Sequence, residues 1–249
     1  MSGPGVLVSE PVVDVATAGE FLAEVLTRVE RPTLEQISRE LESKHLLFAR
    51  LLAGGRAADL DEAGVEQVLR AVFATRRRAQ AITAEVGVER LAAAMADLLD
   101  GDGPVSERFE RFDEVLAPLG DVAFDLPGEL LHFTYPDRYW LWTRWLWDPR
   151  IETGSLRLVT SDELDLTAES RGETYVRVGH AMALVHEMGR AAGLVTSEEL
   201  LGTDVFLACV YAIYMYTVLR MRMTQEFNRI VPELPDLVRR LLGVRHLEI

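Results

Sequence analysis

Motifs that cap the first turn of a helix recur along this chain. In each, a Thr or Asp lies three residues before a Glu or Gln. The first side chain accepts a hydrogen bond from a free backbone N–H, and the second reaches back to the cap. Examples occupy residues 17–20, 33–36, 59–62, 160–163 and 196–199. Most of them open stretches in which apolar residues recur at three- and four-residue spacing, so the chain is predicted to be all-α.

The predicted helices leave few residues for other structure. Helix-stopping segments such as Gly54-Gly55 and Gly101-Asp102-Gly103-Pro104 separate them. We predict a compact globular domain of eight to ten helices over residues 16–249, a flexible N-terminal arm at 1–15 and a soft boundary at 101–104. The helices are expected at residues 17–28, 33–52, 61–86, 88–100, 106–116, 168–192, 197–201, 204–230 and 235–242. Residues 151–160 are the only plausible strand, or an extended loop.

All four tryptophans lie within residues 140–147, in the segment Arg138-Tyr-Trp-Leu-Trp-Thr-Arg-Trp-Leu-Trp147. Tyr135-Pro136-Asp137 precedes this segment and Asp148-Pro149 closes it. A surface helix has one apolar face, whereas residues 138–147 are apolar nearly all round. We therefore predict a buried helix at the centre of the domain.

The charge balance excludes several partners. Asp and Glu outnumber Lys and Arg by 40 to 26, which gives a formal charge of −14. Nucleic acids and anionic membranes attract basic surfaces, so neither is expected as the main partner. Arg76-Arg77-Arg78 is the only basic cluster, and we interpret it as an exposed helix surface.

Other sequence signals point to a cytoplasmic protein. The most apolar stretch, residues 205–219, is shorter than the roughly 20 residues that span a bilayer, and we expect it in the core or a subunit interface. The N-terminal residues lack the basic segment and the long apolar run of a secretory signal. A single cysteine, Cys209, excludes an intramolecular disulfide framework and is expected to be buried and inert.

Two Glu-x-x-His pairs are candidate metal ligands: Glu42 with His45, and Glu129 with His132. Residues three apart share one face of a helix, and two such pairs with two further carboxylates hold two iron or manganese ions in helical bundles. Iron, manganese or zinc is the expected metal. The alternative is that both histidines are structural and hydrogen-bonded, since no further pair of carboxylates stands out.

The tryptophan segment also suggests a binding pocket. Trp140, Trp142 and Trp145 would shape an apolar cavity, and Arg138 or Arg144 would bind an anionic group. The alternative is a structural core helix whose arginine head groups reach solvent.

Three functions remain open, and whether the protein is an enzyme is undecided. We favour a non-catalytic interaction or accessory protein in a homo- or hetero-oligomer. The chain lacks the common catalytic motifs, and residues 205–223 carry Phe, Tyr, Met and Leu around the whole helix. The alternatives are a helical-bundle metalloenzyme that uses the Glu-x-x-His pairs and a small-molecule binder with a tryptophan-lined pocket.

Overall fold

Helices dominate the computed structural model, which describes residues 12–193, 201–223, 232–245 and 247. These residues form eleven α-helices and three short 3-10 helices, with two isolated β-bridges and no longer strand. The predicted all-α class is confirmed, with one helix more than the range expected. No helix in these segments is long and apolar enough to cross a membrane.

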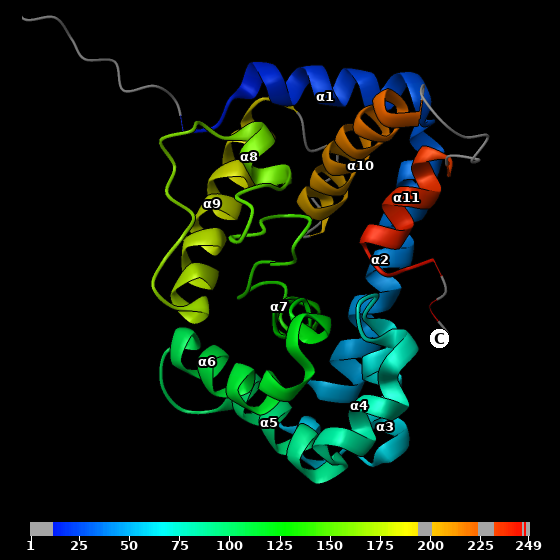
Figure 1. The fold of residues 1–249 in the computed structure, drawn as a ribbon. Coiled ribbons are helices and arrows are strands. Elements are labelled where there is room, and N and C mark those ends of the chain that lie inside the picture. Colours follow the sequence, from blue (N-terminus) through cyan, green and yellow to red (C-terminus); the bar gives the residue numbers. More distant parts are fainter. Residues whose placement is uncertain (1–11, 194–200, 224–231, 246, 248–249) are drawn as a thin grey trace, which may run out of the picture.

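The N-terminal helices supply two sides of the molecule. In Figure 1, α1 lies across one end, α2 runs down one side, and α3 to α6 close the opposite end. Their bounds are α1 (Val15–Arg28), α2 (Arg31–Leu52), η1 (Arg56–Asp59), α3 (Glu62–Ala71), η2 (Arg76–Arg78), α4 (Ala79–Val86), α5 (Val88–Asp100) and α6 (Val105–Leu116).

The C-terminal helices complete the frame and cross it. The remaining elements are η3 (Ala117–Ala123), α7 (Leu126–Thr134), α8 (Ser155–Val159), α9 (Arg171–Ala191), α10 (Gly202–Met223) and α11 (Leu234–Leu241). Helix α9 packs on α6 along the second side, and α10 extends from the centre toward α1 (Figure 1). Helix α11 packs against α10 and α2. All nine residues of α7 are buried, so α7 is the central helix.

The single helix predicted over 61–86 is wrong. The structure has α3, η2 and α4 in its place, because the backbone becomes extended at Val72. The hydroxyl of Thr75 then donates to the Leu69 carbonyl oxygen at 2.7 Å, which satisfies one of the free carbonyls at the end of α3. Arg76, Arg77 and Arg78 consequently lie in a turn rather than on a continuous helix.

The tryptophan segment is buried and central, as predicted, but it is not a helix. Residues 138–147 run as turns and irregular backbone between α7 and α8. Trp142 and Trp147 are each 1% exposed. A buried irregular segment must satisfy its backbone polar groups elsewhere. The carbonyl oxygens of Tyr139 and Trp140 accept hydrogen bonds from His132 Nδ1 and from the Tyr175 hydroxyl, at 2.8 and 3.0 Å respectively.

Close packing reinforces this arrangement. The amide N–H of Arg144 donates to Asp125 Oδ1 at 2.8 Å, and the Trp142 indole N–H donates to the Trp147 carbonyl at 2.9 Å. The backbone of α7 approaches so near that a Cβ on Gly128 would lie 2.1 Å from the Trp142 carbonyl oxygen. The irregular segment 138–147 thus places its large aromatic rings in the core, and hydrogen bonds from neighbouring elements hold the segment in position.

Several other predicted segments differ from the structure in their type or their bounds, or lie outside the described residues. The strand predicted over 151–160 is wrong, since residues 155–159 form α8 and only isolated bridges flank it. Helix α9 begins after Ser170, whose hydroxyl accepts from the Glu173 amide, rather than at residue 168. The predicted helix at 197–201 and the end of the helix predicted over 204–230 lie mostly outside the described residues, as does most of the arm at 1–15.

Candidate functional site

An ion pair between α2 and α7 lies in the centre of the molecule. Lys44 Nζ is 2.5 Å from Glu129 Oε2, and the two side chains are 0% and 4% exposed. The same ammonium group donates to the Leu242 carbonyl oxygen at 2.9 Å and lies 4.4 Å from the centroid of the Phe133 ring. Burial raises the pKa of Glu129, and the charge of Lys44 opposes that rise. One cation therefore joins α2, α7 and the end of α11.

A second buried pair joins α7 to α10. His132 Nε2 is 2.9 Å from Asp204 Oδ2, and each side chain is 1% exposed. Since Nδ1 faces the Tyr139 carbonyl oxygen, both ring nitrogens have acceptors as partners, which favours the doubly protonated ring. Burial opposes protonation, but the Asp204 carboxylate and the Tyr139 carbonyl outweigh it and raise the pKa of His132.

The four predicted metal ligands lie in three different environments. Glu129 pairs with Lys44, and His132 pairs with Asp204. His45 Nδ1 is 2.9 Å from the Phe133 carbonyl oxygen, and Glu42 is exposed on α2. Among the described residues no three His, Cys, Asp or Glu side chains come together as a metal-binding group. The histidines have the hydrogen-bonded environment that was the alternative to the metal site.

The predicted pocket residues also have separate partners. Trp142 is in the core, and Trp145 is 7% exposed beside Tyr211 of α10, with 6.4 Å between the ring centroids. Arg144 pairs with Asp125 at 3.3 Å. Arg138 is exposed, and its guanidinium carbon lies 5.0 Å from the centroid of a neighbouring tyrosine ring. The structure places both tryptophans among packed aromatic side chains.

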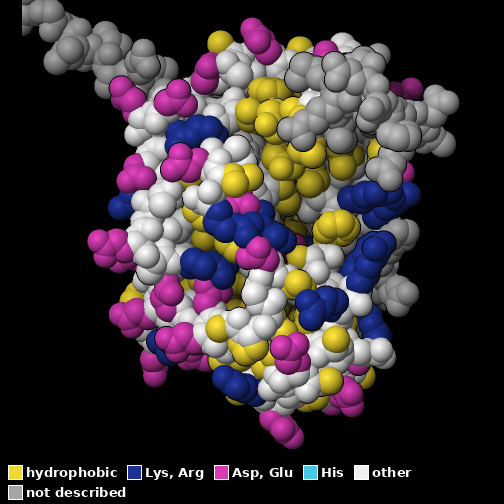
Figure 2. Space-filling view, viewed as in Figure 1, with side chains coloured by type: hydrophobic (Ala, Val, Ile, Leu, Met, Phe, Trp, Pro, Cys, Tyr) yellow, Lys and Arg dark blue, Asp and Glu magenta, His cyan; other side chains and the backbone are white. Residues whose placement is uncertain are grey.

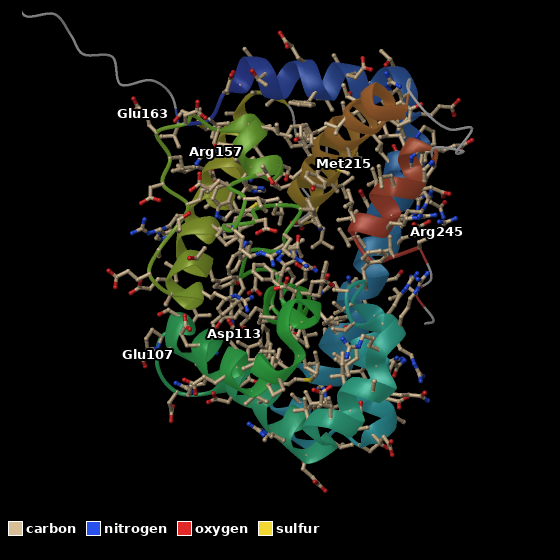
Figure 3. The ribbon with its side chains drawn as sticks, viewed as in Figure 1. Glu107, Asp113, Arg157, Glu163, Met215 and Arg245 are labelled. Carbon is tan, nitrogen blue, oxygen red and sulfur yellow. The ribbon has the colours of Figure 1, made fainter. Side chains whose placement is uncertain are left out.

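Helix α10 changes character along its length. Residues 203–210 are buried, whereas Tyr211, Tyr214, Met215 and Tyr216 are half-buried. The Tyr211 and Tyr214 ring centroids are 6.0 Å apart, which continues the aromatic contact from the tryptophan segment. Figure 2 shows hydrophobic side chains gathered over this helix, and Figure 3 labels Met215 on it. We call Tyr211, Tyr214, Met215 and Tyr216 the α10 surface.

Sequence reasoning missed the roles of Lys44 and Asp204. Lys44 carried a signal, because it is the only lysine of the chain and lies three residues after Leu41 and four before Phe48, on the buried stripe of α2. Asp204 carried none, because an acid at the start of a helix is an ordinary cap. Its partner His132 is 72 residues away.

The fold and these contacts define an all-α helical protein with a polar, ion-paired centre. Comparison of the chain with protein-family models, with curated proteins and with solved structures finds no significant match. The function is therefore argued from the residues themselves.

Proposed function

We propose that the protein is a non-catalytic interaction protein that binds a partner helix on the α10 surface. The observation that carries this proposal is the change in burial along α10, from a buried first half to the half-buried Tyr214, Met215 and Tyr216. Tyrosine and methionine are enriched at protein interfaces, where a flexible thioether and an amphipathic ring adapt to an apolar partner.

The buried polar pairs fit a binding role better than a catalytic one. Acid–base catalysis requires the reacting group to reach its substrate. The side chains of Lys44, Glu129, His132 and Asp204 are at most 4% exposed, and each is engaged by another helix. These charges hold α2, α7 and α10 together, so binding of a partner is expected at exposed residues rather than at these pairs.

The partner that fits is an amphipathic helix with basic residues beside its apolar face. An apolar face that lies on an apolar surface is a common mode of peptide recognition. The charge of −14 slows the approach of a second acidic copy and attracts a basic partner. A heterologous basic helix is therefore favoured over self-association.

A fluorescein-labelled helical peptide of leucine and lysine tests the proposal. Fluorescence anisotropy with the full-length protein should show saturable binding, and Met215→Asn should weaken it by at least about tenfold, or about 1.4 kcal/mol. Leu46→Asn is the matched control, because Leu46 is 59% exposed on α2 and the change also leaves the net charge at −14. The control should bind like the unchanged protein.

Three results would contradict the proposal. One is the absence of saturable binding, and another is an equal loss in both variants. The third is a dimer in sedimentation velocity that Met215→Asn dissociates, which would assign the surface to a second copy of the chain.

A further inference from the structure

A half-open pocket lies between α2, α3, η2 and the C-terminal residues. Its volume is about 560 Å³, within the range of roughly 300–1,000 Å³ that is typical of small-molecule sites. The polar part of the lining consists of Gln67, Arg70, Arg76 and Arg77. Leu47 and Leu247 supply apolar contact area. The α10 surface contributes none of the residues that line this pocket.

Positive charge is concentrated here in a strongly acidic protein. Arg76 is half-buried, and burial together with the neighbouring charges of Arg77, Arg240 and Arg245 lowers its pKa. Figure 2 shows Lys and Arg side chains gathered on the side of α11, where Figure 3 labels Arg245. The guanidinium group of Arg76 thus lies close enough to three others to be repelled by them.

Among the residues that the structure describes, few carboxylates neutralise these groups. Arg70 pairs with Glu66 at 2.5 Å, and Arg245 pairs with Asp236 at 3.2 Å. For Arg76 and Arg77, the part of the chain that the structure describes offers no carboxylate within 4.0 Å. Like charges that are held together without counter-charges favour the binding of an anion.

The local fold explains why two of three adjacent arginines line the pocket. The sequence prediction placed Arg76, Arg77 and Arg78 on an exposed helix surface, whereas they occupy the η2 turn. Arg76 packs with its guanidinium carbon 5.3 Å from the centroid of the Phe73 ring. Arg78 is exposed and is not part of the lining, so the turn separates it from its two neighbours.

We propose that this pocket binds a small organic phosphate of nucleotide size, with Arg76 and Arg77 on the phosphate oxygens. The planar, forked guanidinium group matches phosphate and donates two parallel hydrogen bonds to it. A bare phosphate ion would fill only part of 560 Å³. Leu47 and Leu247 give the uncharged part of the ligand an apolar surface.

Isothermal titration calorimetry on the full-length protein tests this site with three probes: ADP, pyrophosphate and adenosine. ADP should bind saturably, pyrophosphate more weakly, and adenosine not at all, because adenosine lacks the phosphates. Arg76→Ala and Arg77→Ala should each weaken ADP binding by at least about tenfold, because each removes charge-assisted hydrogen bonds to the phosphate oxygens. Arg78→Ala removes the same charge from the same turn and should leave the dissociation constant within about twofold.

Several outcomes would overturn the proposal. Absence of saturable ADP binding would do so, and so would adenosine binding as tightly as ADP. Equal losses in Arg78→Ala and Arg77→Ala would show a diffuse charge effect rather than a site. A short single-stranded RNA that binds more tightly than ADP through the same arginines would assign the pocket to nucleic acid. If Arg76→Ala fails to fold, Arg77→Gln carries the same test, because Arg77 is exposed.

Discussion

Replacement of Lys44 by methionine tests how the centre of the molecule is held together. Methionine keeps most of the length of the side chain but removes the charge and the hydrogen bonds to Glu129 and Leu242. The Glu129 carboxylate, whose side chain is 4% exposed, is then left without its cation. Breaking a buried pair by removing one partner costs about 3–5 kcal/mol. That loss is a large share of a total stability of about 5–15 kcal/mol.

The double variant Lys44→Met/Glu129→Leu should recover most of this loss. Replacing a buried ion pair with apolar side chains of similar volume is often neutral or stabilising. The double variant is therefore expected within about 1 kcal/mol of the unchanged protein, which gives a large interaction energy between the two sites. Arg111→Met is an exposed comparison, because the Arg111–Asp97 pair has side chains that are 43% and 40% exposed, and its effect should be much smaller.

Urea denaturation followed by circular dichroism measures these free energies of unfolding at pH 5 and pH 8. Burial raises the pKa of Glu129 in the folded protein above the unfolded value of 4.5. The folded state then binds a proton more tightly, so stability falls as the pH rises from the unfolded toward the folded pKa. Lys44→Met should accordingly lose less at pH 5 than at pH 8. A loss below about 1 kcal/mol in Lys44→Met would refute the reasoning. So would a double variant whose loss equals the sum of the losses in Lys44→Met and in a separate Glu129→Leu variant.

Three further perturbations follow from the same contacts. The pKa of His132 should lie above 6.5 in an NMR titration and should fall in Asp204→Asn. The stabilisation from protonated His132 is complete below pH 6.5 and is lost as the pH rises through the folded pKa. A free energy of unfolding that stays constant above pH 6.5 would contradict this prediction. Burial raises the pKa of Cys209 to about 12, so the thiol should react with a disulfide reagent at pH 8 only after unfolding, and rapid native labelling would show that the site is accessible. Gly128→Ala should destabilise the protein by about 1–3 kcal/mol, because the new Cβ would lie 2.1 Å from a backbone oxygen. Gly179→Ala, whose nearest contact is at 3.8 Å, should stabilise it by about 0.5–1 kcal/mol. Thermal denaturation measures both, and equal effects would refute the close approach at Gly128.

Local sequence signals predict most of the helices but not the conformation of the buried segment at the centre of the fold. The apolar spacing of α5 and the Gly-rich stop after it predicted residues 88–100, and the helix spans Val88–Asp100. Such signals depend on neighbours within one turn. The segment 138–147 contains apolar residues on every side, and that composition suits a buried helix and a buried loop equally. The bonds that decide between them come from Asp125 and Tyr175, 19 and 35 residues away, and no periodicity reveals them.

For the candidate sites too, the sequence indicates which residues are unusual but not which groups they contact. The sequence identifies His45 and His132 either as metal ligands or as hydrogen-bonded structural groups, and in the structure their partners are a carbonyl of α7 and a carboxylate of α10. Spacing along one helix identifies residues that share a face, and it does not show what that face meets. The pocket beside η2 was missed because the Arg76-Arg77-Arg78 run is charged in either conformation, and only the break in the backbone after α3 turns two of its side chains toward α2.

The buried pairs also bear on how the α10 surface is presented. Asp204 ties the first turn of α10 to His132, and His132 holds the Tyr139 carbonyl at the start of the tryptophan segment. Trp145 of that segment then contacts Tyr211, where the α10 surface begins. The surface is thus continuous with the buried core, and we expect it to need little ordering before a partner binds, which lowers the entropic cost of association. Asp204→Asn should therefore weaken binding of the leucine–lysine peptide together with stability, whereas Met215→Asn should weaken binding and leave the unfolding transition nearly unchanged.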